Sequence, residues 1–312
     1  GVGVTTAPFD QVEQQVIDRY AAGDYAAALE VLDRAGPHLP GQWERIAYWR
    51  ACLLARSGRT AEAVDVLAQA YEAGAWWSPR LLEMESDLDP LWQHPGYRSL
   101  LGDMDERRRR WQARATGLYV GGVAGGWPFV GLHGRNQIFE TDAARIGGAL
   151  GEGWEVAIPE SGQRIASDGP VWDDADACCE QVLTVADLLW PRRPFVLGGF
   201  SQGGRRALQI GLRHGGRIPA VLAVSPMLLR SSEIAEVIEW LGHPPWPLVG
   251  IVAGKQDPAT RGVETVAHHL EEEGVETIVE LVADSGHRWL EPPRRMLTAL
   301  ATRLAERGAE SN

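Results

Sequence analysis

The stretch FVLGGFSQGG, residues 195–204, decides the fold of this chain. It begins as an apolar run, continues as Gly199-Phe200-Ser201-Gln202-Gly203, and precedes a helical pattern at residues 205–214. A serine at a sharp strand-to-helix turn exposes its hydroxyl, and small residues two positions before and after it relieve the crowding. The N-terminus of the following helix favours negative charge. We therefore predict that Ser201 is a nucleophile.

Short apolar runs alternate with helical patterns on both sides of this turn. The runs predict strands at residues 129–133, 154–158, 195–199, 220–224, 248–252 and 277–282. Strands that alternate with helices form a mainly parallel sheet that is covered on both faces. We therefore predict an α/β domain at residues 115–312.

A repeat occupies the beginning of the chain. The stretch GDYAAALEVL at residues 23–32 resembles GRTAEAVDVL at residues 58–67, with an offset of 35 residues. Glycine turns and apolar spacing predict helices at residues 9–22, 25–36, 42–57 and 60–73. The pattern resembles the tetratricopeptide repeat, whose period is about 34 residues. Because arrays with two such repeats are usually unstable, we expect this helical domain, residues 1–114, to pack against further structure.

Composition and charge exclude several functional classes. The chain has 42 acidic and 30 basic side chains, so its net charge of −12 disfavours nucleic acid as a partner. The basic run at residues 107–110 lies in a helix predicted at residues 97–114, where Asp103 and Glu106 precede Arg107 and Arg110 by four positions. This spacing is typical of an exposed helix. Without a long apolar stretch, we predict no membrane span and a cytoplasmic location.

The cysteines do not form a recognisable pattern. Cys52, Cys178 and Cys179 are an odd number, two of them are adjacent, and they contain no CxxC pair. A disulfide framework and a thiolate zinc site are therefore not expected, and we predict no metal site.

A nucleophilic serine needs a base and an acid, which follow it in the order Ser, Asp or Glu, His in this kind of fold. His287 follows the strand predicted at residues 277–282, whereas His214, His268 and His269 lie in or at the end of helical patterns. Asp257 follows the strand predicted at residues 248–252, and we predict it as the acid. Asp284, closer to His287 in sequence, is the alternative.

The negative oxygen of the reaction needs two N–H donors. One is predicted to be the backbone N–H of Gln202, the residue after the nucleophile. The other is predicted to come from the loop after residues 129–133, where Gly134 allows a turn and Arg135 presents its N–H. His133 would then have a structural role.

The runs Gly199-Phe200-Ser201-Gln202-Gly203-Gly204 and Leu132-His133-Gly134 are similar to those of the α/β-hydrolase superfamily. Residues 116–309 specifically resemble the phospholipase/carboxylesterase group, which includes acyl-protein thioesterases. The sequence departs from that group at Asn136, where a second glycine is usual, and in its N-terminal repeats.

The resemblance implies an α/β-hydrolase fold and hydrolysis of an ester or thioester. Ser201, Asp257 and His287 would form the triad, and the N–H groups of Arg135 and Gln202 would form the oxyanion hole. No metal or organic cofactor is implied. An acyltransferase or cyclase would use the same triad, and a scaffold with a retired hydrolase fold is the alternative from another class.

The substrate is expected to be a small ester or thioester. Trp240, Trp246 and Trp289 are predicted to line its pocket, because they lie in the short insertion before residue 248 or next to His287. The helical domain would either cover part of the active-site mouth or mediate dimerisation or partner binding. These two hypotheses are equally consistent with the sequence.

Overall fold

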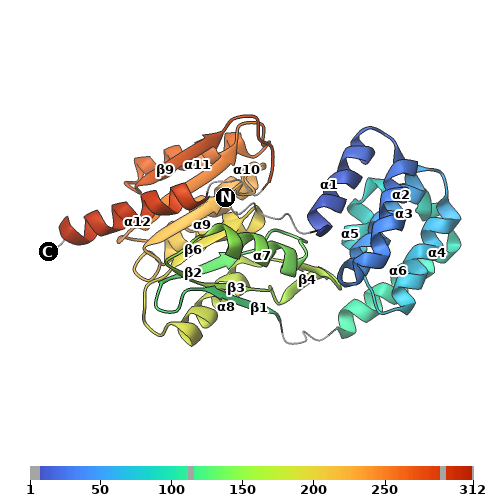
Figure 1. Ribbon diagram of the computed structural model, residues 1–312, viewed down its shortest axis with the longest axis horizontal. Coiled ribbons are helices and arrows are strands. Elements are labelled where there is room, and N and C mark those ends of the chain that lie inside the picture. The colour runs from blue at the N-terminus through green and yellow to red at the C-terminus, as the bar shows by residue number, and fades with distance from the viewer. Residues whose placement is uncertain (1–7, 112–115, 289–292, 311–312) are drawn as a thin grey trace. The chain divides into compact units, whose positions relative to one another are not determined.

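The computed structural model describes residues 8–111, 116–288 and 293–310 (Figure 1). The chain divides into two compact units, one of Gly1–Arg114 with Arg164–Gly169 and the other of Ala115–Gln163 with Pro170–Asn312. The predicted division between residues 114 and 115 does not include the short segment Arg164–Gly169 in the helical part. Each unit has its own apolar core.

The first unit is almost entirely helical. Its elements are α1 (Pro8–Ala21), α2 (Tyr25–Ala35), α3 (Trp43–Arg56), α4 (Thr60–Glu72), α5 (Pro79–Met84) and α6 (Pro95–Arg110), with 3-10 turns at Gly36–His38, Pro40–Gln42 and Ser86–Gln93. The first four helices begin and end close to the predicted positions. Glycine turns and apolar periodicity therefore determine these helices locally.

The sequence repeat corresponds to two equivalent turns. Gly23 and Gly58 have φ values of 71° and 75°, a conformation that glycine adopts without a steric cost. The alanine five positions after each glycine, Ala28 or Ala63, is fully buried. The small side chains allow neighbouring helices to approach closely.

Residues beyond the repeat helices complete the helical core. Leu82 and Leu88, Tyr97 and Met104 are fully buried in the same cluster as the repeat helices. The segment Arg164–Gly169 also belongs to this unit: Ser78 N donates to Ile165 O (2.7 Å), and Ser167 N donates to Trp76 O (2.9 Å). The hydrophobic pattern of residues 164–169 does not predict that this segment belongs to the helical unit.

The second unit contains a mostly parallel sheet. In the described part of the chain, seven strands lie in the order β1-β3-β2-β6-β7-β8-β9, and β1 is antiparallel to β3. Their bounds are β1 (Leu118–Gly122), β2 (Trp127–Leu132), β3 (Trp154–Pro159), β6 (Val196–Phe200), β7 (Ala220–Val224), β8 (Leu248–Gly254) and β9 (Thr277–Val282). A separate two-stranded ribbon consists of β4 (Gln163–Ala166) and β5 (Gly169–Val171). The edge strand β1 was not predicted.

Helices cover both faces of the sheet (Figure 1). They are α7 (Phe139–Ala149), α8 (Ala175–Leu189), α9 (Gln202–Arg213), α10 (Ser231–Glu239), α11 (Thr260–Glu272) and α12 (Pro293–Glu310). One core contains residues of α8, α9 and α11, and the other contains residues of α7 and α12. Leu197 belongs to the first core and Val196 to the second, so alternate residues of β6 are buried on opposite faces. The predicted sheet with flanking helices and a helical N-terminal region is confirmed.

This topology positions the candidate site. Strands β2, β6, β8 and β9 are parallel, so their carboxyl ends lie at one edge of the sheet. Ligands bind outside the carboxyl ends of the strands in open α/β sheets. Arg135, Ser201, Asp257 and His287 all follow such strand ends.

Among the helices of the described residues, none combines the length and apolar composition that a bilayer crossing requires. The three cysteines are free thiols.

Candidate active site

The turn after β6 holds Ser201 in an unusual backbone conformation. Its φ and ψ are 55° and −116°, a region that non-glycine residues rarely occupy. Ser201 N donates to Val224 O (3.1 Å), and Ser201 O accepts from Met227 N (2.9 Å) and Arg205 N (3.1 Å). These backbone bonds maintain the strained turn, which presents the hydroxyl at the start of α9.

The glycines on either side of Ser201 are sterically required. A Cβ on Gly199 would lie 2.3 Å from Gly203 O, and a Cβ on Gly203 would lie 2.4 Å from Leu132 O. Both contacts involve backbone atoms that cannot turn aside. The motif therefore reflects close approach of the turn to itself and to β2.

Ser201, His287 and Asp257 form a continuous hydrogen-bonded chain. The Oγ of Ser201 lies 2.8 Å from Nε2 of His287, whose Nδ1 lies 2.9 Å from Oδ2 of Asp257. An ionised carboxylate only accepts hydrogen bonds, so Nδ1 carries the proton and Nε2 is free to accept one from the serine. The structure thus brings the three predicted catalytic residues together in the arrangement of a serine triad.

Asp257, the predicted acid, is the carboxylate that is hydrogen-bonded to His287. The Asp257 side chain is 1% exposed, and its second oxygen, Oδ1, accepts from Ala259 N at 2.9 Å. Asp284 is exposed at the tip of the loop, with a φ of 55°. Both oxygens of Asp257 are therefore fixed, and its carboxylate orients the imidazole of His287.

Other residues hold the His287 loop, and the motif search did not identify them. The Oγ of buried Ser225 donates to Arg288 O at 2.5 Å. A Cβ on Gly254 would lie 2.1 Å from Ser285 O, so the loop contacts the end of β8 directly. The Phe200 ring stacks on His287 with 5.6 Å between ring centroids. Residue spacing alone gives no signal for these contacts.

The loop after β2 is fixed by His133, which is fully buried. Its Nε2 accepts from Ser161 N (3.0 Å), so its Nδ1 carries the proton and donates to Gly134 O (2.8 Å). Gly134 N in turn donates to Asp142 Oδ2 (2.8 Å). His133 therefore has a structural role, and the backbone before Arg135 has a fixed direction.

Asn136 is the departure from the group that the sequence resembles. Its φ of 57° is left-handed, and asparagine tolerates this conformation better than most residues do. Asn136 N donates to Pro170 O at 2.9 Å. The departure at Asn136 is thus compatible with the turn that presents Arg135.

The predicted oxyanion donors follow β2 and β6, which are neighbouring strands. Within the described residues, no protein acceptor is bonded to the backbone N–H of Arg135 or of Gln202. Both groups are therefore available to a developing negative oxygen, as the predicted roles require.

The structure does not bring two of the predicted pocket tryptophans, Trp240 and Trp246, to Ser201. Trp240 packs under the guanidinium of Arg213 (3.6 Å to the ring centroid) at the far end of α9, a helix about 18 Å long. Trp246 precedes β8, whereas Asp257 follows it, so these residues lie at opposite edges of the sheet. Trp289 lies outside the described residues.

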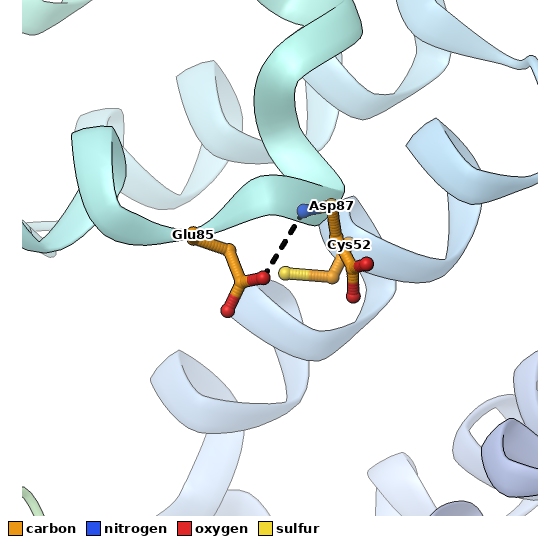
Figure 2. Close-up of side chains that lie close together, drawn as sticks. All are labelled: Cys52, Glu85 and Asp87. Carbon is orange, nitrogen blue, oxygen red and sulfur yellow. Dashed lines mark hydrogen bonds between the residues drawn. The ribbon is translucent and has the colours of Figure 1, made fainter.

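Cys52, Glu85 and Asp87 form a cluster with metal-ligand chemistry in the helical unit (Figure 2). Burial first, and then the nearby carboxylates, raise the pKa of the Cys52 thiol well above its usual range. Asp87 N donates to Glu85 Oε1 (3.1 Å), and Tyr20 OH donates to Asp87 Oδ1 (2.8 Å). The cluster is thus a protonated thiol with hydrogen-bonded carboxylates, and we assign it no metal.

A comparison with known protein families matches the helical region of the chain. Residues 9–113 match a protein family described as "A/B hydrolase-like, N-terminal domain". No curated protein matches the chain. The resemblance of the helices to tetratricopeptide repeats therefore stays a prediction.

Similar solved structures include an uncharacterized protein from Bacillus cereus ATCC 10987, with 21% identity, a TM-score of 0.51, and coverage of 96% of this chain and 99% of that one. Esterase PE8 has 22% identity and a TM-score of 0.45, with coverage of 60% and 97%. A Bacillus cereus carboxylesterase has 14% identity and a TM-score of 0.47, with coverage of 60% and 94%. The first covers both units, and the other two cover somewhat more than half of this chain.

The sheet topology, the serine turn and the matched N-terminal region lead to the same classification. This chain has an α/β-hydrolase fold, preceded by an all-helical region that matches the A/B hydrolase-like N-terminal domain.

Proposed function

We propose that the protein is a serine hydrolase that cleaves a carboxylic ester or thioester through an acyl-enzyme on Ser201. The observation that carries the proposal is the chain of hydrogen bonds from Ser201 Oγ to His287 Nε2 (2.8 Å) and from His287 Nδ1 to Asp257 Oδ2 (2.9 Å). A serine hydroxyl is a weak nucleophile unless a base removes its proton. The 2.8 Å distance from Ser201 Oγ to His287 Nε2 supports His287 as that base.

In the first half of the reaction, Ser201 Oγ attacks the carbonyl carbon and its proton moves to His287 Nε2. The carbonyl oxygen becomes negative and accepts hydrogen bonds from Arg135 N–H and Gln202 N–H. The imidazolium is stabilised by the Asp257 carboxylate. His287 then donates the proton to the departing alcohol or thiol, which leaves an acyl group on Ser201.

In the second half, water enters and His287 Nε2 removes its proton. The hydroxide oxygen attacks the acyl carbon, and the same two N–H groups hold the second tetrahedral oxyanion. Collapse of this intermediate breaks the bond to Ser201 Oγ, which regains its proton from His287. The carboxylic acid is released and the enzyme returns to its starting state.

A fluorophosphonate probe tests the nucleophile directly. We expect the native protein to be labelled at Ser201 and Ser201→Ala to remain unlabelled. Ser232→Ala is the matched control, because Ser232 is an exposed serine on α10. A native protein that does not react with the probe would overturn the proposal and favour the scaffold alternative.

Nitrophenyl esters and acyl thioesters of graded chain length test the reaction class. We expect release of free acid that depends on Ser201. An added alcohol or thiol acceptor separates hydrolysis from acyl transfer, because an acyltransferase would form the new ester or thioester in preference to the acid. The cytoplasmic location, the dimer and the protein partner stay predictions.

A further inference from the structure

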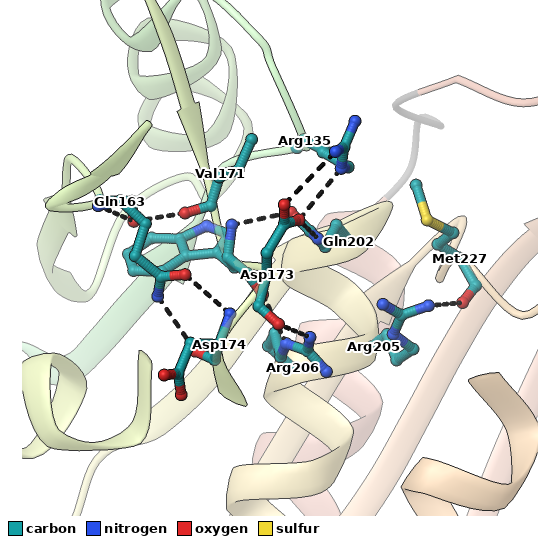
Figure 3. Close-up of polar contacts among 12 residues, drawn as sticks. Arg135, Gln163, Val171, Asp173, Asp174, Gln202, Arg205, Arg206 and Met227 are labelled. Atoms are coloured by element: carbon teal, nitrogen blue, oxygen red, sulfur yellow. Dashed lines mark hydrogen bonds and ion pairs between the residues drawn. The ribbon is translucent and has the colours of Figure 1, made fainter. Parts of the chain in front are cut away.

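Asp173 links the two residues whose N–H groups form the proposed oxyanion hole (Figure 3). Its Oδ1 accepts from Arg135 Nε (3.0 Å) and from Gln202 Nε2 (2.7 Å), and its Oδ2 accepts from Arg135 Nη2 (3.3 Å). Arg135 follows β2, whereas Gln202 follows β6. One carboxylate thus joins the loop after β2 to the start of α9 through two side chains.

The segment that carries Asp173 is itself held firmly. Arg206, which is 3% exposed, donates from Nε to Trp172 O (2.7 Å) and from Nη2 to Asp173 O (2.9 Å). Trp172 N donates to Gln202 Oε1 (2.8 Å), so the amide of Gln202 is bonded at both ends. The bonds from Arg206 and Gln202 leave this backbone little freedom to move.

Asp174, the residue after Asp173, is also held by hydrogen bonds. Asp174 N donates to Gln163 Oε1 (2.7 Å), and Gln163 Nε2 donates to Asp174 O (3.0 Å). Trp172 is fully buried, stacks on His133, and donates from Nε1 to His133 O (3.1 Å). The Asp173 segment and the Arg135 loop therefore share a rigid base.

The charge of Asp173 is compatible with a nearby oxyanion. Burial alone would raise the pKa of its carboxyl, but hydrogen bonds from Arg135 and Gln202 and the positive charges of Arg135 and Arg206 hold it below its usual value. The carboxylate is therefore ionised at neutral pH, where its bonds to both side chains are strongest. The two guanidinium groups offset its negative charge.

We propose that Asp173 is a positioning residue that sets the separation and direction of the Arg135 and Gln202 N–H groups. It does not contact the reacting atoms. The inference rests on the proposed function, because an oxyanion hole is effective only when its donors are held in place before the reaction. Loss of the link would leave both donors present but less well aligned.

Asp173→Asn tests the link. Asparagine keeps the shape, and its oxygen can still accept from Gln202 Nε2 and Arg135 Nε. Its NH₂ group, however, would face the Nη2 donor of Arg135, and the negative charge that attracts the guanidinium is lost. We expect kcat for a nitrophenyl ester to fall by roughly 10- to 100-fold with little change in KM, below the loss typical of a deleted oxyanion donor. Active-site titration with the fluorophosphonate counts the competent molecules and separates this effect from misfolding.

A trifluoromethyl ketone gives the second measurement, because its adduct with Ser201 carries a tetrahedral oxyanion. A weakened oxyanion hole lowers its affinity in proportion to the fall in kcat/KM. A merely structural role would reduce the number of active sites and leave this affinity unchanged. Asp176→Asn is the matched control, since the Asp176 side chain is 88% exposed, and it should retain native values.

A double-mutant cycle with Arg135→Met tests whether Asp173 acts on the oxyanion hole through the Arg135 side chain. If Asp173 acts through Arg135, the double variant loses no more than the worse single variant, whereas independent losses would multiply.

Native kcat and native ketone affinity in Asp173→Asn would overturn the inference. If that variant does not fold, Arg135→Met, which removes a side chain that is 33% exposed, provides the same comparison. A native protein without probe labelling would instead contradict the proposed function.

Discussion

The loops after β2 and β9 both carry a histidine past the carboxyl edge of the same sheet. His133 is fully buried, and both of its ring nitrogens are bonded to backbone groups. The His287 side chain is 38% exposed, and its nitrogens are bonded to the side chains of Ser201 and Asp257. A backbone partner fixes a loop, whereas a serine hydroxyl partner can give up a proton. The partners, more than the residue type, separate the structural histidine from the candidate base.

The largest effect is expected for the histidine that faces Ser201. His287→Gln should lower kcat for a nitrophenyl ester by about 10⁶-fold, the loss seen when a triad base is removed. The free energy of unfolding should change little, because the side chain is partly exposed. Steady-state kinetics and urea unfolding measure the two quantities. A near-native kcat in His287→Gln would show that His287 is not the base, and His287 and His133 would then not differ in role.

Asp257→Asn should have the next largest effect on activity, a loss of about 10⁴-fold in kcat. The amide can donate to His287 Nδ1, which would favour the tautomer that has its proton on Nε2 and cannot accept one from Ser201. Asp284→Asn is the matched control from the alternative acid and should retain native kcat. If Asp284→Asn were the inactive variant, the triad assignment would be wrong.

His133→Phe should act on stability. The phenyl ring can keep the stacking on Trp172, but Ser161 N–H and Gly134 C=O lose their partner. Each buried unpaired group costs about 1–3 kcal/mol in the free energy of unfolding. Urea unfolding should show this loss in His133→Phe and little loss in His287→Phe. Equal stability of the two variants would contradict the proposed division of roles.

The smallest effect concerns the left-handed residue in each loop, Asn136 (φ 57°) and Asp284 (φ 55°). Asn136→Ala and Asp284→Ala should each lower the free energy of unfolding by about 1 kcal/mol, because a Cβ without a compensating polar group is strained in this conformation. Asn136→Gly and Asp284→Gly are the controls and should retain stability in thermal unfolding. Similar losses of unfolding free energy in the two alanine variants would show that both loops need a left-handed residue. The loops would then differ only in the partners of their histidines.

The choice of the triad acid shows what residue order alone can predict. The order of residues placed Ser201 and His287 after strands, since apolar runs and glycine turns are local features. It favoured Asp257, which follows the strand predicted at residues 248–252, and kept Asp284 of the His287 loop as the alternative. Their difference depends on which carboxylate faces the imidazole across two loops, and this is a tertiary contact.

Trp240 and Trp246 were predicted from their place in the short insertion before residue 248, and the structure places them away from Ser201. Trp240 and Trp246 lie near Asp257 in sequence, but the chain from Trp240 passes the far end of α9 and crosses the sheet along β8 before it reaches Asp257. A strand of seven residues carries the chain about 23 Å. Trp240 and Trp246 are therefore close to Asp257 in sequence but not close to Ser201 in the fold.

The sequence by itself determined the helices of the N-terminal region, the parallel strands and the strained serine turn, because periodicity and glycine sterics act over a few residues. Only the tertiary structure placed Arg164–Gly169 in the helical unit and brought Asp257 to His287 and Asp173 to Arg135 and Gln202. These contacts join segments that are far apart in sequence. Their geometry depends on how the strands and helices pack, which residue spacing does not encode.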